Sequence, residues 1–442
     1  MTTKGVQPLI KSKTDKYIWI LLFILLVERL LLFYELGPSY MSHSDDDAYI
    51  SMGLFFARTG IISVDGYPGA LTMPGMPVVI GLASLVFGDG TSLLIALKLV
   101  WIVMGVFTAF YTYKAVTVFC PWWAGLFAAA HFLIPNMAWM NHLILTETPY
   151  MLFFAMSIYY TFMMGERSEN RDLVLYTLSV FFALVFRSNI IIMPLFTAAY
   201  VWFRKKDSAR LLRGAVCFVS AMMLFIVPWT IRNYIQFGAF ISTSYGAGDP
   251  MYLGTYQGEG FPDDSELDYE NNVYSVLHEK YAGYYDENGN VKEPRHIDYL
   301  FMMERKLMAQ YRMREWWKTN PWSMLKSYLL IKPRLMLNWS WAWREVYGVS
   351  WLTLHRISQV NMLFCVCTFV MSLLWKRHRF PVVFLTGLYV VSVYVYSLGY
   401  VTDRYTSTLL LPRYILAGFG IALVVELAST HMHRDLSSDC FE

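Results

Sequence analysis

Residues 17–49 read YIWILLFILLVERLLLFYELGPSYMSHSDDDAY, and this stretch decides the fold class. Residues 17–36 are nearly all apolar, and a helix of about 20 such residues is long enough to cross the hydrocarbon core of a bilayer. Three consecutive carboxylates, Asp45, Asp46 and Asp47, follow shortly after the span. Because adjacent carboxylates repel one another, such a run is solvated, held by a cation or used for proton chemistry.

Apolar stretches of this kind recur along the 442-residue chain, in which 56% of the residues are hydrophobic and only 16% are charged. We therefore expect an all-α, polytopic membrane protein with about ten transmembrane helices. The predicted spans are residues 17–36, 93–116, 122–140, 149–164, 173–186, 190–203, 215–231, 351–375, 381–400 and 409–427. The composition excludes a soluble enzyme, and a net charge of +3 gives no reason to expect a nucleic-acid partner.

The distribution of basic residues predicts the orientation, because Lys and Arg accumulate in cytoplasmic loops. Residues 1–16 contain four lysines and lead into the first span without a small-residue cleavage site, so we place this segment in the cytoplasm. Because successive spans cross the membrane in alternating directions, the cytoplasmic side also holds the basic segments 204–213 and 376–379 and the tail, residues 428–442. A first external loop, residues 37–90, and a larger external region, residues 232–350, lie on the other side. The larger region divides the transmembrane part into residues 17–231, which include the first external loop, and residues 351–427.

Helical patterns also occur outside the predicted spans. Residues 48–59 and 76–87 have the amphipathic character of helices that lie along the membrane interface, and residues 298–317 form a similar pattern in the larger external region. Modest external loops and the lack of eukaryotic signals favour a multi-pass protein of the bacterial plasma membrane. Its active site is expected on the extracytoplasmic side.

Four ionisable residues lie near the outer ends of the predicted spans: Glu147, Arg187, Arg232 and Arg404. A charge in hydrocarbon costs ~2.5–3.5 kcal/mol on insertion scales, so such residues usually face the bundle interior or a wet cavity. Any single arginine could instead reach the interface by snorkelling. Together with the Asp run at the same level, however, they indicate one site where arginines bind phosphate and carboxylates move protons.

Several short motifs follow one another in a recognisable order: DDDAY (45–49), ARTG (57–60), MPGMP (73–77), FG (87–88), LTE (145–147), PWTIRNY (228–234), FG (237–238), DRY (403–405) and Pro412. Their order and placement resemble those of the GT-C glycosyltransferases, especially the branch that contains protein O-mannosyltransferases and lipid A aminoarabinose transferases. The resemblance runs from the first span to the last, except for residues 256–326.

The resemblance implies a polyprenyl-phosphate-linked sugar as donor, with its headgroup outside the membrane, and an acceptor that attacks the anomeric carbon in one inverting displacement. It also implies that an acid of the first loop is the general base. The distance from Tyr49 indicates Asp45, with Asp46 in the neighbouring acidic position, while Asp47 leaves the assignment open by one or two positions. Glu147 matches a second acid at the start of the fourth span.

The chemistry of the residues agrees with these roles. A phosphate leaves as a stable anion whose growing charge must be met by fixed cations, and Arg187, Arg232 and Arg404 are the candidates. A carboxylate that takes the proton of an acceptor hydroxyl contributes ~10²–10⁴-fold. Paired carboxylates could also bind an oxygen-preferring divalent cation, with Asp45 and Asp46 as the expected ligands. Other candidate site residues are His43, Asp47, Tyr49, Arg58 and Tyr405.

The main alternative is a polytopic transporter or flippase for a lipid-linked or anionic solute, since this class also uses intramembrane arginines and external gating loops. Transporters often contain inverted repeats and charges near the midplane. This chain shows no convincing repeat, and its charges gather at one face, which favours the enzyme. A structural membrane subunit with a solvated acidic loop is a third reading. The acceptor stays open between a protein hydroxyl, an envelope glycan and a glycolipid.

Overall fold

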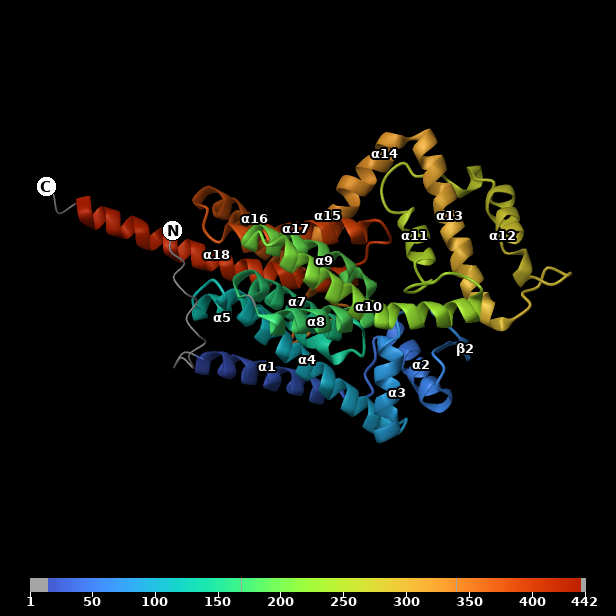
Figure 1. Cartoon of the computed structure of the whole chain (residues 1–442), viewed down its shortest axis with the longest axis horizontal. Helices are drawn as coiled ribbons and strands as arrows, with labels where there is room; N and C mark the ends of the chain where they lie inside the picture. Colours follow the sequence, from blue (N-terminus) through green and yellow to red (C-terminus); the bar gives the residue numbers. More distant parts are fainter. Residues whose placement is uncertain (1–14, 168, 339, 439–442) are drawn as a thin grey trace.

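The fold is known from a computed structural model that describes residues 15–167, 169–338 and 340–438. Most of the predicted cytoplasmic N-terminus and the last four residues of the predicted tail therefore lie outside the described residues. The described chain forms a bundle of long helices, and smaller helices extend from one end of it (Figure 1).

Six helices in the described part of the chain are long and apolar enough to cross a membrane on their own. They are α1 (Asp15–Leu36), α4 (Thr91–Thr117), α10 (Ser208–Phe237), α16 (Trp351–Trp375), α17 (Arg379–Ser397) and α18 (Asp403–Ser438). At ~1.5 Å per residue, a helix the length of α10 extends roughly 45 Å. The protein is therefore a multi-pass, helical membrane protein, as the sequence predicts.

The other predicted spans also contain helices: α5 (Trp122–Ala130), α6 (Pro135–His142), α7 (Glu147–Glu166), α8 (Asn170–Phe186) and α9 (Met193–Lys205). The prediction of one continuous helix over residues 122–140 is wrong. A 3₁₀ turn, His131–Leu133, separates α5 from α6, because Pro135 has no N–H to donate and disfavours helical geometry at the residue before it. The total of ten crossings stays a prediction.

The two ends of the bundle differ. The start of α1 and the end of α18 lie at one end, whereas α2 (Asp45–Thr59), α3 (Gly75–Phe87) and the helices of the larger external region lie at the other (Figure 1). Between α2 and α3, strands β1 (Ser63–Val64) and β2 (Tyr67–Pro68) form a small antiparallel hairpin. Its turn, Asp65-Gly66, has the two positive φ angles that favour this dipeptide. The two segments predicted to be external therefore share one end of the molecule.

The larger external region is built from short helices around one long helix. These are α11 (Gly248–Gly254), α12 (Ser275–Lys280), α13 (Ile297–Thr319), α14 (Pro321–Lys326) and α15 (Lys332–Asn338), so the predicted helix over residues 298–317 is confirmed. Arg312 of α13 is fully buried and donates to the Thr255 hydroxyl at 2.8 Å and the Pro262 carbonyl at 3.0 Å. Its guanidinium lies 3.8 Å from the centre of the Tyr256 ring. This contact set fastens α13 to the loop that follows α11.

Helices α7 and α18 occupy the interior of the bundle. Nearly all residues of α7 are buried, and 83% of the most apolar stretch of α18 is buried. Each of them begins close to a charged residue, Glu147 in α7 and Arg404 in α18. The starts of these two interior helices therefore bring charge to the centre of the bundle, at the end where α2 lies.

Candidate active site

The acidic run forms the first turn of α2, which begins at Asp45 rather than at the expected residue 48. Carboxylates are favoured here because the N-terminus of a helix carries partial positive charge. Asp46 is fully buried and turns back toward its own loop. One of its oxygens accepts from the Ser42 backbone N–H at 2.5 Å, and the other accepts from the Ser44 N–H at 3.0 Å. Asp46 therefore shapes the loop.

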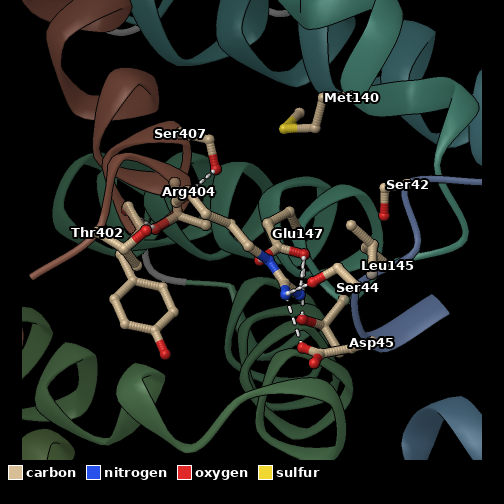
Figure 2. A network of polar contacts seen from close by, with 12 residues as sticks. Ser42, Ser44, Asp45, Met140, Leu145, Glu147, Thr402, Arg404 and Ser407 are labelled. Carbon is tan, nitrogen blue, oxygen red and sulfur yellow. Dashed lines mark hydrogen bonds and ion pairs between the residues drawn. The ribbon is translucent and has the colours of Figure 1, made fainter. Parts of the chain in front are cut away.

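Asp45 points toward the bundle, although its side chain is 53% exposed. Its Oδ2 accepts a bond of 2.6 Å from Nη1 of Arg404, and the Ser44 hydroxyl lies 3.4 Å from the same nitrogen (Figure 2). Asp47 is also exposed, and its polar neighbour is His43, whose Nδ1 lies 3.2 Å away. The three adjacent carboxylates thus have three different environments, and Asp45 is the one that meets the interior charges.

Glu147, the first residue of α7, is fully buried between two arginines. Its Oε1 accepts from Nε of Arg404 and from Nη1 of Arg187, both at 2.6 Å. Its Oε2 accepts from Nη2 of Arg404 at 3.2 Å, as Figure 2 shows. A buried carboxylate is tolerated when charged partners and hydrogen bonds satisfy it, and this geometry meets that condition.

Arg187 lies at the C-terminal end of α8 and uses a single nitrogen for its polar contacts. Nη1 donates to Glu147 and to the Thr146 hydroxyl, the latter at 3.1 Å. The guanidinium also lies 5.3 Å from the centre of the Tyr405 ring. Within the described ranges, Nε and Nη2 of Arg187 have no protein acceptor. These N–H groups are therefore free to bind an anion.

We use the term charge cluster for Asp45, Glu147, Arg187 and Arg404. Two carboxylates and two guanidinium groups balance one another, although their residues come from α2, α7, α8 and α18. Tyr49 is buried close to this cluster. Burial raises the pKa of its hydroxyl, and the charge of Asp45 raises it further, so Tyr49 stays neutral.

Two predicted site arginines lie outside the charge cluster. Arg232, near the end of α10, donates to the carbonyls of Ile62 and Gly69 at 2.9 and 2.8 Å, on either side of the β hairpin. Arg58 forms an exposed pair with Asp89 at 3.0 Å. Both hold parts of the first loop, and their predicted roles in the site stay predictions.

The predicted metal ligands do not fit a divalent cation as they lie. Both carboxylate oxygens of Asp46 accept bonds from its own loop, and Asp45 is paired with Arg404. Among the residues that the structure describes, no three His, Cys, Asp or Glu side chains gather in a way that could hold a metal ion. We therefore assign no step to a metal.

The sequence reasoning missed a lysine behind the acidic loop. Lys98 of α4 is fully buried, and its Nζ lies 2.5 Å from the Tyr40 carbonyl and 3.0 Å from Nε2 of His142. The bond to Tyr40 anchors the segment that leads to Asp45. The available signal was a charge within the apolar span 93–116, whose other lysine, Lys114, lies near the opposite end, because a charge in such a span usually has a specific partner.

Comparisons with known proteins identify solved structures with a similar fold. No family model matches the chain, and no curated protein matches it. The apo oligosaccharyltransferase of Archaeoglobus fulgidus, a GT-C glycosyltransferase, superimposes with a TM-score of 0.59 at 13% sequence identity. The fold is GT-C-like. The match covers 97% of this chain and 52% of the oligosaccharyltransferase, so this chain spans about half the length of that protein.

ArnT from Cupriavidus metallidurans is a second similar structure. It matches with a TM-score of 0.42 when bound to undecaprenyl phosphate and 0.41 in the apo state. Each match has 13% identity and covers 93% of this chain and 78% of ArnT. The resemblance in fold that the sequence predicts is thus confirmed by the oligosaccharyltransferase.

Proposed function

We propose that the protein is an inverting glycosyltransferase that moves a sugar from a polyprenyl-phosphate-linked donor to an extracytoplasmic acceptor. The observation that carries the proposal is the charge cluster at the start of the interior helices α7 and α18. Within a GT-C-like fold, this cluster supplies both a half-exposed carboxylate and arginines that can meet a phosphate.

Asp45 is the general base in this proposal. Its Oδ2 is held by Arg404, whereas its Oδ1 accepts no hydrogen bond from any residue that the structure describes. An acceptor hydroxyl within about 3 Å of Oδ1 would be in reach for proton transfer. Asp46 lacks such a free oxygen, which favours Asp45 among the three adjacent acids.

Arg187 and Arg404 bind the donor phosphate. Glu147 holds both guanidinium groups in place, so their orientation is fixed before the donor arrives. A phosphate that binds Arg404 also competes with Asp45 for Nη1, which loosens the hold on the base. Glu147 is thus a positioning residue, since its two oxygens are committed to the arginines.

The reaction then needs one displacement at the anomeric carbon. The acceptor oxygen forms a bond to this carbon while the bond from the carbon to the phosphate oxygen breaks. The leaving polyprenyl phosphate takes the electron pair, and Arg187 and Arg404 balance its new negative charge. The acceptor proton moves to Asp45.

A small cavity lies beside the segment that follows Arg187. It lies between α7, α17 and α18 and is lined mainly by apolar and aromatic side chains: Tyr150, Phe154, Ile192, Val395, Tyr396 and Leu409. Asn189, two residues after Arg187, also lines it. As the structure stands, the cavity has room for about one water molecule, so we place no part of the donor lipid in it. The acceptor is a protein hydroxyl, an envelope glycan or a glycolipid outside a bacterial plasma membrane.

Donor turnover by the purified protein in liposomes tests this proposal. A panel of polyprenyl-phosphate sugars, radiolabelled in the sugar, is supplied without an acceptor, so that slow hydrolysis is the signal. We expect release of water-soluble sugar from at least one donor. If no donor releases sugar, and a donor or another anionic solute instead crosses the membrane only when the protein is present, the transporter alternative replaces the enzyme.

A further inference from the structure

Helix α14, the π turn Ser327–Ile331 and α15 follow one another without a break and form one helical run. Its exposed residues are Trp322, Lys326, Leu329, Leu330 and Arg334, which lie three or four residues apart except for the adjacent Leu329 and Leu330. This spacing puts them on one face of the run. We call this set the exposed stripe. The buried residues are Ser327, Lys332, Pro333 and Met336, and three of them, Ser327, Lys332 and Met336, belong to the other face.

The exposed stripe is unusually apolar for a surface that faces water. Trp322 is 79% exposed, Leu330 64% and Leu329 50%. Of its two basic residues, Lys326 is paired with Glu259 at 2.5 Å, whereas Arg334 has a long apolar stem that allows its charge to reach a polar layer while the stem lies along apolar surface. A Trp beside Leu residues, with Lys and Arg at intervals, is typical of a helix at the boundary between lipid headgroups and acyl chains.

Contacts with α17 fix the position of this run along the bundle. The Tyr394 hydroxyl donates to the Leu329 carbonyl at 3.2 Å. Tyr394 lies three residues before Ser397, the last residue of α17, which is ~4.5 Å along a helix. Leu329 therefore lies at the level where the candidate span α17 ends.

From Leu329 the run continues into α15, which follows α17 toward the middle of the bundle. Met336 of α15 packs in one apolar cluster with Tyr389 and Val393 of α17. In Figure 1, α14 and α15 form an inclined path from the external helices toward the group of α16, α17 and α18. The exposed stripe is thus continuous with a helix surface that crosses the membrane.

We propose that the exposed stripe is a membrane-interface anchor, occupied by phospholipids of the bilayer that the protein itself spans. Trp322 lies at the headgroup level and Leu329 and Leu330 reach the acyl chains. The anchor fixes the external region, which follows α10 at one end and joins this run at the other, against the membrane. The inference depends on α17 being a span and is independent of the proposed catalytic activity.

Site-specific photocrosslinking tests the anchor in the full chain. The photoreactive amino acid p-benzoylphenylalanine replaces Trp322 or, in a second variant, Leu330, and the protein is reconstituted in phosphatidylcholine nanodiscs. Val366, an exposed residue of the span α16, is the positive control, and Asn288, in an exposed turn of the external region, is the negative control. Gel filtration before illumination checks that each variant is folded.

We expect phospholipid adducts, detected by mass spectrometry, at residue 322 or 330 and at 366, but none at 288. If residues 322 and 330 both behave like 288 while 366 gives an adduct, the anchor is wrong. Crosslinks from 322 and 330 to another protein in native membranes, without lipid adducts in either setting, would likewise overturn it and indicate a protein partner on this face.

Discussion

Nη1 of Arg404 lies 2.6 Å from Oδ2 of Asp45, a residue 359 positions earlier in the chain. The remaining nitrogens of the same guanidinium bind Glu147. One side chain of α18 therefore joins the external loop to the buried start of α7. The same guanidinium thus stabilises the buried Glu147 and contacts Asp45, the proposed base.

Removing the Arg404 guanidinium should destabilise the fold. Arg404→Ala leaves Glu147 buried with Arg187 as its remaining charged partner, and breaking a buried pair of this kind costs ~3–5 kcal/mol. Arg404→Lys keeps the charge but loses the forked geometry of the guanidinium. Its free energy of unfolding should therefore lie between those of the wild type and of Arg404→Ala. The measurement is the free energy of unfolding in detergent. Arg58→Ala, which removes an exposed pair, should cost ~0–1 kcal/mol, and equal stability of the two alanine variants would contradict the account.

Lys98→Met should loosen the acidic loop. The Tyr40 carbonyl loses its donor, and an unsatisfied buried polar group costs ~1–3 kcal/mol. We expect faster proteolysis within residues 37–46 and a lower unfolding temperature. Lys318→Met is the control, because Lys318 lies in an exposed pair with Glu315. A loop as protease-resistant in Lys98→Met as in the control would show that Lys98 does not anchor it.

Lys332 predicts a dependence of stability on pH. Its ammonium donates to the Gly254 carbonyl at 3.0 Å, and burial lowers its pKa to about 7. Between about pH 7 and 9, the unfolded chain therefore binds a proton that the folded chain lacks, so stability should rise with pH. Lys332→Met should flatten this rise in a series of thermal unfolding curves. The same slope in wild type and variant would exclude Lys332 as its cause.

The orientation of the chain can be measured by cysteine labelling in sealed cells. Asn288 belongs to the external region, and Ser208 starts α10 at the other end of that long helix. A membrane-impermeant maleimide should label Asn288→Cys in intact cells and Ser208→Cys only after permeabilisation. The wild-type chain controls for its native cysteines. The reverse pattern would mean that the topology is inverted.

Much of this architecture follows from the sequence, because long apolar runs and charge bias depend on the bilayer rather than on tertiary detail. The same reasoning found the members of the charge cluster, since charges at one level of a bundle tend to meet. It favoured Asp45 over Asp46 only by the distance from Tyr49 that the family resemblance implies, because the environments of the two side chains depend on which way each points in the first turn of α2. It also grouped Arg232 with the cluster, although that residue lies at the β hairpin.

The assignment of Asp45 as general base is the central claim, and the most direct test compares donor turnover by three variants in liposomes. Asp45→Asn should lower turnover by ~10²–10⁴-fold, because the proton acceptor is lost while the shape of the side chain is kept. Asp47→Asn should leave turnover close to wild type, and Asp46→Asn should reduce it by less than Asp45→Asn. Wild-type turnover by a folded Asp45→Asn protein would contradict the assignment of the base.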